Sequence, residues 1–339
     1  MEKRIIDLGA KILSAATAVG GKEKKGPLGD LFDLCDPEDR FGKKTWEGAE
    51  SEMQRIAFGT ALAKADCRVE DVGALFAGDL LNQCVASSYG LLSYDVPYLG
   101  LYGACSTCAE GLLLASVFVS RDVYRISAAV TSSHYCAAER QYRTPIEYGA
   151  QRAPTAQWTV TGAGAFLLGN ESSAFPSTAG AVIRRGLPGI VTEKGINDAG
   201  NMGAAMAPAA LDTLVRFFEE SGTSPDNYDC IATGDLGFEG GKILEELMQA
   251  EGYPIGECYT DCGKLIYARE RQDAHGGGSG CGCSAVVLAS YFLPRLAKGE
   301  LRKMLFLSTG AMMSPDSIKQ GENIAAVAHL LEIESEKEE

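Results

Sequence analysis

The chain repeats itself, and the repeat narrows the choice of fold more than any other property of its sequence. Residues 61–80 (ALAKADCRVEDVGALFAGDL) align without a gap with residues 217–236 (FFEESGTSPDNYDCIATGDL). Both stretches read as a helix end, a turn, a short apolar strand and the tripeptide Gly-Asp-Leu. Residues 111–119 (GLLLASVFV) match residues 285–293 (AVVLASYFL) in the same order and at nearly the same offset. Two ordered matches indicate a duplicated half.

Each half is predicted to alternate helices with buried strands. The predicted strands are residues 73–77, 127–131, 157–168, 229–233 and 304–308. Continuous apolar strands alternating with helices are typical of sheets that are covered on both faces. We therefore expect an α/β fold of two duplicated βαβαβ-type halves, residues 1–170 and 171–339.

The remaining segments are predicted to be connections. Residues 144–155 and 175–206 are rich in Gly, Pro and Ser, which favours loops. Residues 332–339 read as a solvated acidic tail. His329 is expected on the surface of a helix and is given no role.

Composition excludes several classes of function. The formal net charge is −14 at pH 7, which argues against binding to nucleic acid or to an anionic membrane surface. An anionic ligand would therefore need a local positive pocket. The apolar runs are too short to span a bilayer, and no signal peptide is recognisable, so we expect a protein made in the cytoplasm.

The cysteines fit a reducing compartment. There are 11, and we expect them to be buried, reduced thiols. The spacing Cys105-x-x-Cys108 lacks both a second cysteine pair for zinc and the βαβ setting of a thioredoxin. We predict no metal and no cofactor. A redox or metal function of Cys105 and Cys108 stays open as an alternative.

Cys105 lies at the corner between a strand and a helix in LYGACSTCAEGLLLAS, residues 101–116. Nucleophilic cysteines occupy such corners because helix N–H groups and the helix dipole favour the thiolate. This corner, the duplicated halves and the run TGAGA at residues 161–165 together resemble the thiolase fold of thiolases and ketoacyl synthases. The resemblance implies a thiolase-like fold with its two halves in a five-layer αβαβα arrangement.

Two longer runs narrow the resemblance. Residues 131–165 (TSSHYCAAERQYRTPIEYGAQRAPTAQWTVTGAGA) and 29–54 (GDLFDLCDPEDRFGKKTWEGAESEMQ) are similar to the stage V sporulation protein AD family. This resemblance implies binding of dipicolinic acid, free or as its calcium chelate. It also implies a place in the apparatus that moves this acid into the developing spore. The chain would sit peripherally at the spore inner membrane, attached through other membrane proteins of that apparatus.

The positions that carry catalysis in the fold are altered. Thiolase-fold enzymes pair their cysteine with a histidine from the second half, which should follow the strand at residues 229–233. Asp235 stands there instead, and a carboxylate opposes the charge of a thiolate. His275 lies near the second expected position, and Asn82 resembles the polar residue that thiolases place after an early strand. We therefore predict a binding protein without enzymatic activity, with Cys105, Asn82, Asp235 and His275 around the ligand.

A dianionic ligand needs donors on both carboxylates. The helix start at Cys105 offers backbone N–H groups to one of them. The other is expected to meet a positive side chain from the next loop, where His134, Arg140 and Arg143 are candidates. For any single arginine, ion pairing with Glu139 or Glu147 is the alternative.

Two further expectations concern activity and assembly. The alternative function is an acyltransferase or ketoacyl synthase that uses Cys105 as nucleophile with His275 as base. Residues 98–103 (YLGLYG) read as an apolar strand that thiolase-fold dimers pair across their two-fold axis, so we expect a homodimer.

Overall fold

The computed structural model describes residues 4–142 and 152–337. Its strands are β1 (Ile6–Gly20), β2 (Leu34–Asp36), β3 (Val72–Gly78), β4 (Tyr98–Leu101), β5 (Ile126–Ser133), β6 (Trp158–Thr159), β7 (Gly162–Asn170), β8 (Ala181–Leu187), β9 (Cys230–Thr233), β10 (Tyr259–Asp261), β11 (Gly278–Ser279), β12 (Lys303–Met312) and β13 (Ala325–Ser335). Its α-helices are α1 (Gly21–Lys24), α2 (Trp46–Lys64), α3 (Val85–Leu91), α4 (Thr107–Ser120), α5 (Tyr135–Tyr142), α6 (Met202–Ser221), α7 (Gly237–Ala250), α8 (Cys262–Ile266), α9 (Cys281–Val287), α10 (Leu293–Lys298) and α11 (Pro315–Lys319).

The main sheet shows the duplication directly. From its centre outward, one side runs β1-β7-β5-β3-β4 and the other runs β8-β13-β12-β9-β10. Leaving aside β2, β6 and β11, each half of the chain contributes five strands to this order. Numbered along the chain within each half, they lie from the centre outward as the first, fifth, fourth, second and third strand. β1 and β8 pair antiparallel in the middle. β9 therefore holds the place in the second half that β3 holds in the first, as the sequence repeat predicts.

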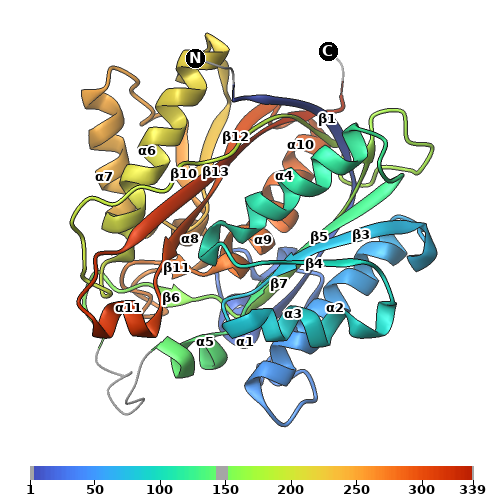
Figure 1. The fold of residues 1–339 in the computed structure, drawn as a ribbon, viewed down its shortest axis with the longest axis horizontal. Helices are drawn as coiled ribbons and strands as arrows, with labels where there is room; N and C mark the ends of the chain where they lie inside the picture. The colour runs from blue at the N-terminus through green and yellow to red at the C-terminus, as the bar shows by residue number, and fades with distance from the viewer. Residues whose placement is uncertain (1–3, 143–151, 338–339) are drawn as a thin grey trace.

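Helices separate and cover the two sides of this sheet. α4 packs on β3, β5 and β7 of one half and on β12 and β13 of the other. α2 and α6 pack on the two halves from outside, and Figure 1 shows α4 and α9 lying between these outer layers. Most of α4 and all of α9 are buried, because both helices are apolar nearly all round. This is the expected five-layer α/β arrangement.

Three expectations about loops and ends are wrong. The region 175–206 contains the central strand β8, and it ends in the start of α6. The acidic end is not a solvated tail, because β13 continues to Ser335 and Glu332 is buried. His329 lies within β13 rather than on a helix, and its Nδ1 accepts the Gly189 N–H at 3.0 Å. Burial lowers the pKa of His329 to about 4.

The predicted strand at residues 157–168 is broken in two. Its first part, β6, leaves the main sheet and pairs in parallel with β11. This pairing sets Thr159 beside Ser279, one residue from each half of the chain. Within the described ranges, we find no helix long and apolar enough to cross a membrane.

Candidate functional site

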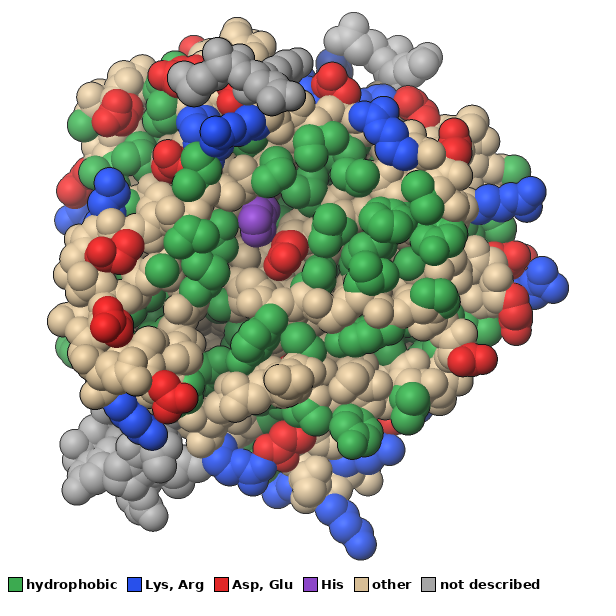
Figure 2. Space-filling model, in the orientation of Figure 1, with side chains coloured by type: hydrophobic (Ala, Val, Ile, Leu, Met, Phe, Trp, Pro, Cys, Tyr) green, Lys and Arg blue, Asp and Glu red, His purple; other side chains and the backbone are tan. Residues whose placement is uncertain are grey.

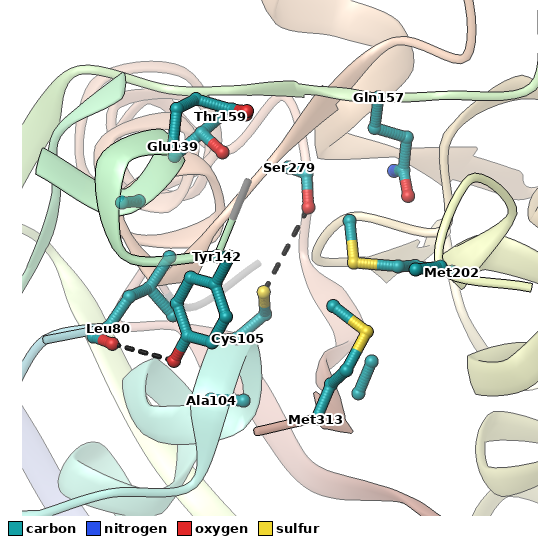
Figure 3. Close-up of a pocket in the computed structure, with 13 residues that line it drawn as sticks. Leu80, Ala104, Cys105, Glu139, Tyr142, Gln157, Thr159, Met202, Ser279 and Met313 are labelled. Carbon is teal, nitrogen blue, oxygen red and sulfur yellow. Dashed lines mark hydrogen bonds between the residues drawn. The ribbon is translucent and has the colours of Figure 1, made fainter. Parts of the chain in front are cut away.

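A small cavity of about 100 Å³ opens where the two halves meet, beside Cys105. Its lining combines apolar, sulfur and polar side chains from both halves: Leu80, Ala104, Cys105, Ala138, Glu139, Tyr142, Gln157, Thr159, Ala199, Met202, Ser279, Ala311 and Met313. Figure 3 shows Cys105 between the ring of Tyr142 on one side and Met313 on the other. Cavities with convergent polar groups are the usual ligand sites of proteins.

Cys105 is placed by a tight corner just before α4. The preceding Ala104 has a φ of +52°, a left-handed conformation that is uncommon for a residue with a side chain. Cys105 itself is only 6% exposed, and its Sγ lies 4.0 Å from the Ser279 hydroxyl. Burial, and next the charge of Asp235, raise the pKa of the Cys105 thiol well above its ordinary value. The thiol is therefore protonated at neutral pH, which is the unreactive form.

Asp235 faces Cys105 from the second half, directly after β9. One carboxylate oxygen accepts the Ser279 hydroxyl and the Gly280 N–H, both at 3.0 Å. The other accepts the Thr309 hydroxyl at 2.8 Å. Burial raises the pKa of Asp235, while these donors and the Cys105 thiol act in the opposite direction. The structure thus brings this carboxyl group next to the cysteine, while Asp235 as a ligand-binding residue remains a prediction.

The two predicted histidines do not belong to the described lining of the cavity. The ring nitrogens of His275 bond to the Ala153 carbonyl at 2.9 Å and to Asp273 at 2.8 Å, on the loop before β11. His134 is buried, with Nε2 2.8 Å from the Asp39 carbonyl. Burial lowers the pKa of His134, so this ring is neutral at neutral pH.

The predicted polar and basic residues of the first half are also engaged in contacts. Arg140 forms an ion pair with Glu47 of α2. Asn82 accepts the Tyr102 hydroxyl at 3.2 Å, so it lies at the outer end of a chain of contacts that includes Tyr142. Arg143 lies outside the described residues. Among the residues of the lining that the structure describes, there is no lysine, arginine or histidine.

Several residues of the lining are not singled out by the sequence, and three of them have long side chains. Gln157 lines the wall, and Met202 and Met313 form the side opposite Tyr142. Gln157 begins the predicted strand that contains the TGAGA run, and this position could have marked it as a site candidate. Met202 precedes the apolar stripe of a helix and Met313 follows a strand, so neither shows a pattern that separates it from ordinary packing.

The alternative site at Cys108 is not built for exposed thiol chemistry. Cys108 is buried one turn into α4, and burial raises its pKa to about 12. The described residues contain no cluster of three or more His, Cys, Asp or Glu side chains suited to a metal ion.

Comparison with known proteins agrees with this architecture. The family model described as Stage V sporulation protein AD (SpoVAD) matches residues 3–334. The chain is 42% identical to Stage V sporulation protein AD of Bacillus subtilis (strain 168) over 316 residues, which cover 93% of this chain and 91% of the relative.

Solved structures of low sequence identity share the fold. The 3-oxoacyl-[acyl-carrier-protein] synthase III of Aquifex aeolicus superposes with a TM-score of 0.57 at 12% identity, covering 96% of this chain and all of that one. Cerulenin-bound OleA of Xanthomonas campestris gives a TM-score of 0.60 at 15% identity, covering 97% of each chain. These likenesses establish a thiolase-like fold. From the family match and the close relative together, the chain belongs to the stage V sporulation protein AD family.

Proposed function

We propose that this chain binds dipicolinic acid (pyridine-2,6-dicarboxylate) without catalysing a reaction on it. In this proposal it supports uptake of the acid into the developing spore, as a peripheral part of a transport apparatus held at the spore inner membrane by partner proteins. Membership in a sporulation family supports a role in the developing spore.

One observation carries the proposal of a binding site rather than an active site. The cavity keeps the cysteine corner of an acyl-transfer enzyme but surrounds it with groups that hold the thiol protonated. Asp235 stands beside Cys105, while His275 is bonded to Ala153 and Asp273 elsewhere. Acyl transfer needs a thiolate and a partner that can donate to a developing oxyanion. A cavity of about 100 Å³ suits a small ring better than a long acyl chain.

Calorimetry with dipicolinate on the purified chain tests the binding. We expect one ligand per chain, because the cavity beside Cys105 is small. Cys105→Trp should abolish binding by filling the cavity, whereas the matched variant Cys105→Ser should change the affinity by less than roughly threefold, about 0.7 kcal/mol. Full binding by Cys105→Trp would place the ligand elsewhere, and no binding by the wild-type chain would refute the proposal.

The second candidate is an acyltransferase that uses Cys105, and the shared fold of the 3-oxoacyl synthases favours it. Incubation with acetyl-CoA followed by intact-mass measurement separates the two functions. We expect no acyl adduct, because the protonated thiol lacks a base. A stoichiometric adduct that disappears in Cys105→Ser would establish the acyltransferase instead.

A further inference from the structure

Gln157 presents an unsatisfied oxygen at the wall of the cavity. The side chain is 3% exposed, and its Nε2 donates to the backbone carbonyls of Asp235 and Gly278, the latter at 3.0 Å. Both partners are acceptors, so the nitrogen must face them and the amide orientation is fixed. The remaining atom, Oε1, is an acceptor that is shielded from water and has no partner among the described residues. Figure 3 shows this oxygen at the end of the cavity that Met202 covers.

Two of the neighbouring hydroxyl groups, those of Ser279 and Tyr142, cannot supply the missing donor. The Ser279 hydroxyl gives its proton to Asp235, and the Tyr142 hydroxyl gives its proton to the Leu80 carbonyl at 2.9 Å. Toward a ligand, both groups therefore offer oxygen lone pairs. Glu139 adds a carboxyl group to the same lining. The described wall is thus rich in acceptors, and a buried acceptor left unpaired is costly.

We infer that Gln157 selects the charge state of the ligand: its Oε1 receives a hydrogen-bond donor or a chelated cation that the ligand brings with it. The thioether of Met202 is flexible enough to move aside for this contact. A bare dianion would meet lone pairs and carboxyl groups, whereas amide and carboxylate oxygens are normal partners of both N–H or O–H donors and calcium. Dipicolinate would therefore enter protonated or as its neutral calcium chelate. This inference rests on the proposed function.

The wild-type chain tests the inference without any substitution. Dipicolinate is titrated calorimetrically at pH 7.5 with excess calcium, and with a calcium chelator in two buffers that differ in ionisation heat. We expect either an affinity at least tenfold higher with calcium or uptake of about one proton per ligand without it. Equal affinity in both conditions, with no proton uptake, would overturn the role of Gln157.

A pair of variants tests the residue itself. Gln157→Glu adds a negative oxygen at the wall, and Gln157→Met removes the acceptor with little change of volume. We expect Gln157→Glu to bind the calcium chelate at least as tightly as wild type and Gln157→Met to bind at least tenfold more weakly. The reverse order would show that the wall meets an anion. Thermal unfolding of both variants confirms that they are folded, and the wild-type titration decides the matter if they are not.

Failure of the proposed function would be visible separately. If dipicolinate binds in neither condition, the proposed ligand is wrong, and benzamide and benzoate are compared as fragments in its place. Benzamide carries a neutral N–H donor and benzoate carries only a charge. Binding of benzamide over benzoate supports the role of Gln157, and any other result overturns it.

Discussion

Glu23 is a carboxyl group that folding takes out of water, and it forms no ion pair with a described residue. It accepts the Thr161 N–H at 3.1 Å and the Tyr267 hydroxyl, and burial raises its pKa from 4.5 to about 7. Below pH 4.5 the group is protonated in both the folded and unfolded chains. Between about 4.5 and 7 only the unfolded chain releases the proton, so the free energy of unfolding falls as the pH rises. The loss is on the order of 3 kcal/mol and is complete above pH 7.

We predict that Glu23→Gln flattens this dependence. Glutamine keeps an acceptor for Thr161 but cannot ionise, so the variant should lose less stability than wild type between pH 5 and pH 8. Thermal unfolding midpoints at the two pH values measure the difference. Glu38→Gln, at an exposed site, is the control. Parallel pH curves for Glu23→Gln and wild type would contradict the assignment.

The sequence predicts the positions of site residues only where neighbours in sequence determine them. Cys105 comes four residues after β4 and Asp235 two residues after β9, so an apolar strand and the next few residues are enough to predict that the two lie close together. Residue type and proximity in sequence also predict His134 and His275 at this site. Their side chains turn toward the carbonyls of Asp39 and Ala153, which are distant in sequence, and no spacing rule shows such partners.

Two errors at the level of elements concern β8 and β13. The Gly, Pro and Ser content of residues 175–206 predicts a connection where β8 lies, and the acidic residues at 332–339 predict a solvated tail where β13 ends. In the sheet Arg185 and Glu332 are register partners, and the guanidinium donates Nε to the carboxylate at 2.9 Å. Charges that are paired across strands can be buried. The sequence shows the charges but not the pairing.

Breaking this pair should be strongly destabilising. Glu332 is 2% exposed, and Glu332→Ala leaves the charge of Arg185 without its buried partner, a loss of about 3–5 kcal/mol. The neighbouring pair of Arg184 and Glu334 is the matched control. Arg184 is 34% exposed, so Arg184→Ala should cost about 1 kcal/mol or less. Urea unfolding measures the loss in free energy of unfolding for both variants. Equal losses would refute the prediction that the buried pair contributes more to stability.

β4 leads to the prediction for assembly. It pairs with β3 on one side and ends the order of the main sheet on the other. Tyr98 and Leu99 on this strand are exposed, and Figure 2 shows apolar side chains gathered over α4 and β4 on one face of the molecule. An open apolar edge strand invites pairing with another strand. A second copy related by a two-fold axis supplies one.

We therefore expect a homodimer by light scattering at tens of micromolar, with twice the mass of the 35.9 kDa chain. Leu99→Lys should shift the mass toward the monomer, because it places a charge at the centre of the edge. Leu31→Lys, at an exposed leucine in another segment, is the control and should remain dimeric. A monomeric wild-type chain would count against the prediction.

At the scale of the whole molecule, the internal repeat predicts more of the fold than any single motif does. Residues 61–80 and 217–236 end in equivalent strands on the two sides of the β1–β8 pair, and the helices after Cys105 and Ser279 are central and buried. Apolar periodicity and duplication suffice for that arrangement. They do not reveal the departure of β6 from the main sheet, because it depends on pairing with β11 more than one hundred residues later.

The net charge of −14 gives a test on the same scale. The field of the whole chain repels a dianion, and salt weakens that repulsion, so affinity for a free dianion should rise with ionic strength. A neutral chelate has no such dependence. In excess calcium we expect the dissociation constant of dipicolinate to change by less than about twofold between roughly 20 and 200 mM KCl, over which the screening length falls severalfold. A clear gain in affinity with salt would show that the ligand arrives charged.

The antiparallel pairing of β1 with β8 also limits how the molecule can move. The two halves share one hydrogen-bonded ladder through the middle of the sheet. A hinge motion that separated them would therefore have to break backbone hydrogen bonds. Entry of a ligand into the cavity would then depend on small displacements of side chains that line it, such as Tyr142 and Met202. A partner protein that detects an occupied cavity would therefore contact those few side chains, while the surrounding backbone would not move.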